Sequence, residues 1–137
     1  MELDVAVERT AVNPWEWSAA LGYSQGEVVS GVERTLYCSG QAAMSASGKP
    51  EHAGDMAAQL ALSLDNLDAV LGTAGMSPAN LVRLTVYTTD VDELFAHYGV
   101  LAGRLAAAGV VPATTVLGVT RLALPELLVE LEGIAVA

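Results

Sequence analysis

The chain has 137 residues, and its 16 acidic and 6 basic side chains give a formal net charge of -10 at pH 7. This length predicts one domain over residues 1–137, because chains split into separate cores only beyond roughly 250 residues. The negative charge excludes a general nucleic-acid binder, whose affinity comes from Lys and Arg on the phosphates. No apolar run approaches the roughly 18 residues of a membrane span, so we expect neither nucleic acid nor a membrane as a partner.

Cysteine and histidine usage limits the chemistry further. Cys38 is the only cysteine, so no disulfide can form within the chain, and we expect a reducing, cytoplasmic location. His52 and His97 lie far apart in the sequence, without zinc-ligand spacing. The sequence also lacks a glycine-rich phosphate loop. We therefore expect no metal and no other cofactor.

The first fifty residues show strand patterns. Val5 and Val7, with polar neighbours, predict a first strand, and residues 13–22, with two tryptophans, predict an irregular segment. Residues 1–22 would thus form an N-terminal strand and loop extension. Residues 23–32 and 35–39 predict two strands of a hairpin joined at 31–34. A loop rich in Ser and Gly follows over residues 42–50.

From Asp55 the apolar residues recur at spacings of three and four, which is typical of a long amphipathic helix. The apolar positions are Met56, Leu60, Leu64, Leu67, Val70, Leu71 and Ala74, and the polar residues at other positions are Gln59, Ser63, Asn66 and Asp68. Gly75, with Pro78 shortly beyond, is expected to end the helix.

The remaining pattern predicts a strand over residues 81–88, a second helix, and two strands over 113–119 and 127–136. Asp90 or Asp92 is expected to cap the second helix, and Gly109 to end it. The apolar face of this helix consists of Leu94, Tyr98, Leu101, Leu105 and Ala108.

The last strand is apolar on both sides. Side chains alternate along a strand, so Leu127, Val129 and Leu131 share one side, and Leu128, Glu130, Glu132, Ile134 and Val136 share the other. We expect helices to cover the first side and another subunit to cover the second.

These elements predict an α+β fold, with two helices packed on one face of a mostly antiparallel six-stranded sheet. The other face of such a sheet needs a cover. Self-association through closed symmetry would provide it.

Seven runs of residues add a more specific indication. They are 38–41 (CSGQ), 54–59 (GDMAAQ), 65–67 (DNL), 74–75 (AG), 85–90 (TVYTTD), 112–115 (PATT) and 129–136 (VELEGIAV). In order and spacing these runs resemble the RidA (YjgF) family, from about residue 23 to the C-terminus. The resemblance implies a chorismate-mutase-like fold, a homotrimer, and clefts between subunits that bind a small molecule.

Family members with deaminase activity hydrolyse reactive enamines and imines to 2-keto acids and ammonia. The resemblance places their carboxylate-binding arginine directly after the Pro-Ala pair, where this chain has Thr114. A guanidinium offers a charged, bidentate fork, whereas a threonine offers one neutral hydroxyl. We therefore expect poor deamination of 2-imino acids, and a substrate without that carboxylate. Whether Arg104 or Arg121 replaces the missing anchor stays open.

By position, the resemblance also implies the other residues of the cleft. Glu130 matches the carboxylate that positions water, and His97 lies near a polar position on the second helix, so these two are the candidate catalytic residues. The candidate substrate-binding residues are Tyr23, Ser39, Gly40, Thr114 and Thr115.

Each candidate also has a purely structural interpretation. Tyr23 would then be an ordinary strand aromatic, and Ser39-Gly40 a tight strand end that uses glycine's conformational freedom. Glu130 would belong to an exposed strand face, and His97 would be a packing residue. Cys38 fits a small buried apolar residue.

Three functions stay open. The first is hydrolysis of a small imine, enamine or related nitrogen compound. The second is non-catalytic binding or regulation, and the third is a cyclisation or tautomerisation with His97 or Glu130 as the base. Some family members have been described as ribonucleases, but the charge of this chain opposes the approach of RNA. Trp15 and Trp17 are expected either to cover a neighbouring cleft or to belong to the core.

Overall fold

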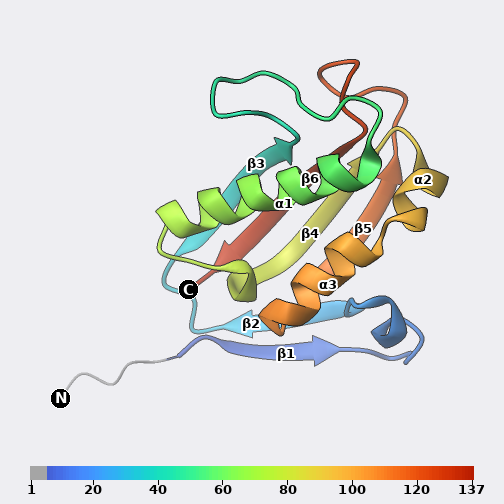
Figure 1. Ribbon diagram of the computed structural model, residues 1–137. Coiled ribbons are helices and arrows are strands. Elements are labelled where there is room, and N and C mark those ends of the chain that lie inside the picture. The colour runs from blue at the N-terminus through green and yellow to red at the C-terminus, as the bar shows by residue number, and fades with distance from the viewer. Residues whose placement is uncertain (1–5) are drawn as a thin grey trace.

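The computed structural model describes residues 6–137, which form an α+β fold with helices packed across a twisted sheet (Figure 1). The strands are β1 (Glu8–Val12), β2 (Gly26–Ser30), β3 (Thr35–Ala42), β4 (Leu81–Thr88), β5 (Ala113–Gly118) and β6 (Val129–Val136). The helices are α1 (Met56–Thr73), α2 (Val91–Ala96) and α3 (Gly99–Ala108), with short 3-10 turns η1 (Ala19–Leu21) and η2 (Pro78–Asn80). None of these helices has the length and apolar character needed to cross a bilayer.

Four strands form the main sheet, in the order β3-β6-β4-β5. Strand β6 is antiparallel to β3 and β4, whereas β4 and β5 run parallel because α2 and α3 connect them as a crossover. Strands β1 and β2 form a separate antiparallel pair, which meets β5 through a single bridge between Ser24 and Ala113. The α+β class is therefore confirmed. The single six-stranded sheet is wrong, because the strands divide into a mixed four-stranded sheet and a pair.

The predicted hairpin over residues 23–39 is also wrong. Strand β2 pairs with β1, and β3 pairs with β6. Between them, the backbone N–H groups of Glu33 and Arg34 donate to the carbonyl of Ala137 at 2.9 and 2.8 Å. The turn thus extends the ladder beside β6 and separates β2 from β3. Strand β1 begins at Glu8. The part of the first predicted strand at Val5 lies outside the described residues.

Arg9 holds the small sheet against the main one. Its guanidinium pairs with Glu27 of β2 and donates to the backbone carbonyls of Ala79 and Leu81, at the start of β4. Charge-assisted hydrogen bonds of this kind are stronger than neutral ones. They fix the β1–β2 pair beside β5, and with it the segment that carries Tyr23.

The first helix matches its prediction closely. The Asp55 side chain accepts a hydrogen bond from the N–H of Ala58 at 3.0 Å, and Gly75 adopts a positive φ of 74° just beyond the end. Its apolar face packs on the sheet beside α3 (Figure 1). The buried members of that face are Met56, Leu60, Leu64, Leu67 and Leu71.

The second predicted helix is interrupted. Asp90 caps α2 by accepting from the N–H of Glu93 at 3.1 Å, but the helix ends at Ala96 and α3 begins at Gly99. The backbone N–H groups of His97, Tyr98 and Val100 donate to the carbonyls three residues before them, instead of four as in an α-helix. Gly99 also disfavours a continuous helix, because glycine is a poor helix former. Phe95 and Tyr98 lie together at this break, with ring centroids 5.6 Å apart.

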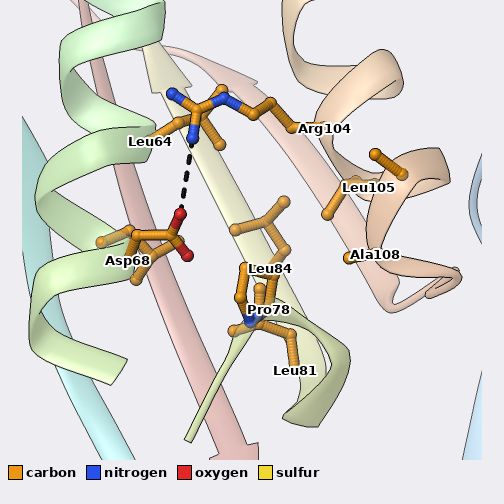
Figure 2. Close-up of a pocket in the computed structure, with 10 residues that line it drawn as sticks. Leu64, Asp68, Pro78, Leu81, Leu84, Arg104, Leu105 and Ala108 are labelled. Atoms are coloured by element: carbon orange, nitrogen blue, oxygen red, sulfur yellow. Dashed lines mark hydrogen bonds and ion pairs between the residues drawn. The ribbon is translucent and has the colours of Figure 1, made fainter. Parts of the chain in front are cut away.

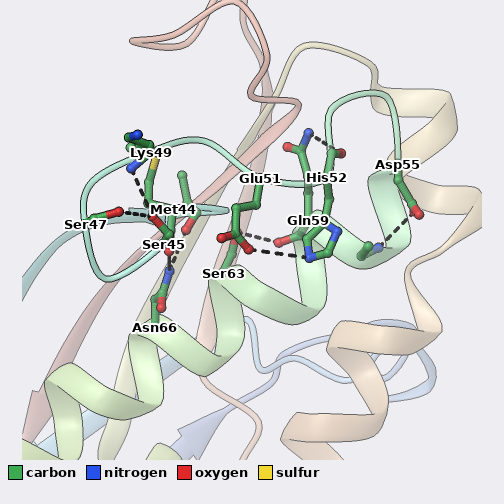
Figure 3. A network of polar contacts seen from close by, with 12 residues as sticks. Met44, Ser45, Ser47, Lys49, Glu51, His52, Asp55, Gln59, Ser63 and Asn66 are labelled. Carbon is green, nitrogen blue, oxygen red and sulfur yellow. Dashed lines mark hydrogen bonds and ion pairs between the residues drawn. The ribbon is translucent and has the colours of Figure 1, made fainter.

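Gln59 is a buried polar residue that the amphipathic pattern did not reveal. It is fully buried on α1, and its amide nitrogen donates to the carbonyls of His52 (3.1 Å) and Glu126 (2.8 Å). Its amide oxygen accepts from the N–H of Leu128 at 2.8 Å. Figure 3 shows this side chain within the polar network of the loop before α1. Gln59 therefore ties α1 to that loop and to the segment leading into β6.

We expect Gln59→Leu to lower the free energy of unfolding by about 2–4 kcal/mol, because each buried backbone group left without a partner costs roughly 1–3 kcal/mol. Urea denaturation followed by circular dichroism measures this loss. Gln41→Leu is the matched control, since the Gln41 amide makes one exposed hydrogen bond, to Ser39. Equal losses in the two variants would contradict the role given to Gln59.

Candidate functional site

A cavity of about 210 Å³ lies beside β5 at the α2–α3 junction. We call it the β5 cavity. It is lined by Leu21, Tyr23, Phe95, Tyr98, Thr114 and Val116. Two of the predicted substrate-binding residues, Tyr23 and Thr114, are thus brought together from positions 91 residues apart in the sequence.

Strand register explains how these residues meet. Thr114 pairs with the buried Leu84 in the parallel β4–β5 ladder, so it faces the helices, and Val116 follows on the same side. Tyr23 precedes Ser24, which forms the bridge to β5. Phe95 and Tyr98 reach the cavity from the junction between α2 and α3. The sequence motifs did not indicate this aromatic pair, because both side chains appeared only as part of a helix.

The polar groups of the β5 cavity are few. The Thr114 hydroxyl donates to the carbonyl of Pro112 at 2.8 Å, so its proton is already engaged. Burial, with the neighbouring Tyr23 phenol as a second cause, raises the pKa of Tyr98 above its ordinary value. The Tyr98 phenol therefore stays protonated and able to donate near neutral pH. Among the described residues, the lining includes no charged side chain.

Trp17 borders the cavity from the N-terminal segment. Its ring packs edge-on against Tyr23, with centroids 6.1 Å apart and an interplanar angle of 80°. Trp17 is 58% exposed and Trp15 60% exposed, so the interpretation of these two residues as core is wrong. The tryptophan segment lies beside the cavity of its own chain.

A second group of predicted residues lies on β3 and β6. We call Ser39, Gly40 and Glu130 the Glu130 cluster. A Cβ atom placed on Gly40 would lie 1.8 Å from Glu130 Oε1, so the carboxylate occupies the space above this glycine. The φ of Gly40 is not positive, and β3 continues to Ala42 through a register shift. The interpretation of Ser39-Gly40 as a tight strand end is therefore wrong, because the glycine serves a close approach instead.

Glu130 and its neighbour Glu132 have different surroundings. Glu132 Oε1 accepts from the Tyr87 hydroxyl at 3.2 Å. Within residues 6–137, no donor lies at hydrogen-bond distance from the half-buried Glu130 carboxylate. Glu130 thus lies directly over Gly40, half-buried, and is not paired like Glu132.

The β5 cavity and the Glu130 cluster lie on opposite faces of the main sheet. Glu130 pairs with Tyr87 of β4, whose neighbour Val86 is buried under the helices, so Glu130 points away from them. Thr114 points toward the helices with Leu84. Adjacent strands lie about 4.8 Å apart, so β6, which carries Glu130, is roughly 10 Å from β5 within the sheet. One protomer therefore cannot present both groups to the same small molecule.

Two further predicted residues stand apart from both groups. His97 Nε2 lies 3.0 Å from Glu93 Oε1 at the end of α2, and His97 does not line the β5 cavity. Thr115 lies on the opposite face of β5 from Thr114, and its hydroxyl accepts from Arg83 at 2.7 Å. Strand alternation separates the two threonines.

The candidate cationic anchors also lie elsewhere. Arg104 pairs with Asp65 and Asp68 at the edge of another cavity, of about 250 Å³, between α1 and α3 (Figure 2). Arg121 lines a different cavity, in the segment before β6. Neither arginine reaches the β5 cavity of the same protomer.

Cys38 and the residue types that can bind a metal were the remaining candidates for a reactive or metal site. Cys38 is buried in the core, where burial raises the pKa of its thiol, which confirms the prediction of a small apolar residue. Of the residues that the structure describes, no three His, Cys, Asp or Glu side chains are grouped to hold a metal ion. That the protein works without a cofactor stays a prediction.

Comparisons relate the chain to known proteins. The model of the family described as Endoribonuclease L-PSP matches residues 15–137. The RutC family protein YjgH of Escherichia coli (strain K12) is 31% identical over 117 residues, covering 85% of this chain and 88% of that protein. A 2-iminobutanoate/2-iminopropanoate deaminase of Rattus norvegicus is 33% identical over 89 residues, 64% of this chain and 63% of that one. A crystal structure of a Rid family protein from Yersinia pestis has a TM-score of 0.82 and 35% identity, covering 94% of this chain and 98% of that chain.

The close approach at Gly40 gives a test of the Glu130 position. We expect Gly40→Ala to displace the carboxylate, because the methyl group takes its space. The change in unfolding free energy should stay below about 1 kcal/mol, since a Glu side chain can move to another rotamer. A crystal structure of the variant measures the displacement. Gly72→Ala, whose Cβ would meet no atom within 4 Å, is the control, and an unmoved Glu130 in Gly40→Ala would contradict this geometry.

Proposed function

The chain belongs to the RidA (YjgF) family, and on that premise we propose that it hydrolyses small imines or enamines in a cleft between two protomers of a homotrimer. The observation that carries this proposal is the division of the site residues into two groups. The β5 cavity and the Glu130 cluster each contain residues that the family resemblance assigns to one cleft, yet they lie on opposite faces of one sheet.

A ring of three chains would unite the two groups. In a head-to-tail arrangement, one surface of each protomer meets a different surface of the next, and the rotation closes the ring. The β5 cavity of one protomer would then face the Glu130 cluster of its neighbour. Such packing would also cover the face of the sheet that carries Tyr37, Tyr87 and Leu117, of which Tyr37 is 76% exposed in the single chain.

Glu130 is suited to act on water. As a water oxygen attacks the carbon of a protonated imine, Glu130 takes a proton from that water, and a neutral carbinolamine forms. The protonated Glu130 then returns the proton to nitrogen, and the C–N bond breaks with its electron pair leaving on ammonia. The Glu130 carboxylate takes the hydroxyl proton as the carbonyl forms, and then releases that proton to solvent. General acid–base catalysis of this kind contributes typically 10²–10⁴-fold.

The charges favour an imine without a carboxylate. The rat relative's name specifies 2-iminobutanoate and 2-iminopropanoate, which both carry one. In this chain Thr114 stands at the position of the anchoring arginine, and its hydroxyl proton is donated to Pro112. A carboxylate in the β5 cavity would find no cation from the same protomer, and an unpaired buried charge is costly. A protonated imine, by contrast, would complement Glu130.

Ribonuclease activity, which the description of the family model suggests, is less compatible with this chain. Its net charge of -10 repels a polyanion. Four of its six basic residues, Arg9, Arg34, Arg83 and Arg104, already donate to protein oxygens. A phosphate backbone would meet little positive charge.

We expect Glu130→Gln to lower kcat/KM at least about 100-fold, because the amide keeps the shape of the side chain and cannot accept the proton. The substrate is the imine that an amine oxidase forms from butylamine. The rate is measured as the release of aldehyde and ammonia in the presence of semicarbazide, which competes for the imine. Glu132→Gln is the matched control on the same strand face and should change the rate less than threefold.

The Glu130→Gln variant, combined with a second variant, tests whether the cleft lies between protomers. Coexpression of Glu130→Gln chains with Val116→Trp chains, whose β5 cavity is filled, should restore activity above that of either variant alone. The restored cleft would combine an intact cavity from one chain with an intact Glu130 from the other. We also expect native mass spectrometry to give three times the 14.1 kDa mass of one chain. A monomeric protein, or no restoration, would refute the shared cleft.

Restoring the cationic anchor should change substrate selection. We expect Thr114→Arg to raise kcat/KM on 2-iminopropanoate by on the order of 10- to 100-fold, since charge-assisted hydrogen bonds contribute about 1.5–3 kcal/mol each. Thr114→Met, which is long but uncharged, is the control and should give no gain. If the arginine variant folds as a trimer and gains nothing, the missing cation does not set the substrate preference.

A further inference from the structure

We propose that the β5 cavity binds an aromatic or cyclic hydrocarbon substituent, so that the preferred substrates are imines of the arylalkyl class. This inference rests on the proposed function and specifies its substrate. It assigns a role to side chains that the family motifs leave unassigned: Leu21, Phe95, Tyr98 and Val116.

The lining and the size of the cavity fit a ring. Three of its six lining residues are aromatic, two are aliphatic, and Thr114 presents its methyl group and an engaged hydroxyl. An apolar cavity of about 150 Å³ is sufficient for benzene, and the β5 cavity measures about 210 Å³. Aromatic side chains bind other rings favourably in offset or edge-to-face arrangements.

The few hydrogen-bond donors of the cavity limit the bound substituent to an uncharged one. Among the residues described, its hydrogen-bond donors are the phenols of Tyr23 and Tyr98, because the Thr114 proton is committed to Pro112. Two phenols can serve one neutral polar atom on the substituent. They cannot neutralise a carboxylate or phosphate, which therefore should not enter.

Trp17 extends the apolar surface over the cavity. Its indole lies edge-on to Tyr23 and remains more than half exposed. Leu21 and Phe95, at 54% and 55%, are exposed to a similar degree on the same rim. A bound ring would cover these three side chains, and burial of apolar area is the main source of binding free energy for such a group. Because Trp17 contacts the lining, its fluorescence should report occupancy.

The first measurement compares two imines that differ in the substituent alone. Imines formed by an amine oxidase from 2-phenylethylamine and from propylamine are tested at equal concentration. We expect kcat/KM to be at least 30-fold higher for the aryl substrate. In Val116→Phe, which fills the cavity, this ratio should fall below about threefold. In Val111→Phe, an exposed position outside the cavity lining, the ratio should persist.

The second measurement needs no catalysis. Binding of 2-phenylacetamide, an uncharged and unreactive analogue, is followed by calorimetry and by Trp fluorescence, with propanamide as the control ligand. We expect phenylacetamide to bind at least tenfold more tightly than propanamide, and Val116→Phe to abolish that difference.

The two measurements separate this inference from the proposed function. If neither imine is hydrolysed but phenylacetamide binds in the expected way, the hydrolase proposal fails and the aromatic site stands. If both imines are hydrolysed at similar rates through Glu130 and phenylacetamide shows no preference over propanamide, the aromatic site is refuted and the hydrolase proposal stands.

Discussion

The alternation of side chains along β5 and β6 is the constraint on which the arrangement of this protein depends. Both strands are fixed against β4 by backbone ladders, and the helices bury one face of all three. Once Leu84, Val129 and Leu131 are committed to the core, the direction of every other side chain on these strands follows. Thr114 must then face the helices, and Glu130 must face away from them. A slip of one residue would exchange core and surface along a whole strand.

This constraint explains why the single chain places the β5 cavity and the Glu130 cluster on opposite faces of the sheet. The β5 cavity is apolar and aromatic, and the Glu130 cluster supplies a carboxylate without a hydrogen-bond donor among the described residues. The hydrolysis that we propose needs both groups, because the β5 cavity has no carboxylate to act as the base and the Glu130 cluster has no cavity to bind the substrate. Their separation across the sheet is the physical argument for a cleft shared between copies of the chain.

Four of the six basic side chains make contacts within the fold, and two of them join its layers. Arg9 anchors the small sheet through Glu27 and two backbone carbonyls. Arg104 of α3 pairs with Asp65 and with Asp68 of α1, and Figure 2 shows the pair with Asp68. A guanidinium suits such positions because its several N–H donors can satisfy more than one acceptor at once. No arginine of the described chain remains at the β5 cavity, so the character of that cavity is set by aromatic rings and a hydroxyl whose proton is already used.

By itself, the sequence determined the α+β class, the limits of α1, the Asp90 cap of α2, the strand β4, and the choice of Tyr23, Thr114 and Glu130 as site candidates. These features depend on local periodicity, on caps and on short motifs, which are carried by neighbouring residues. Strand pairing, the break at His97 and Tyr98, and the burial of Gln59 depend on contacts between distant segments. Only the tertiary structure decided that β2 pairs with β1, that Phe95 and Tyr98 join Thr114, and that Glu130 lies over Gly40 on the opposite face. The physical reason is that hydrogen-bond ladders and core packing select among partners that local patterns leave equivalent.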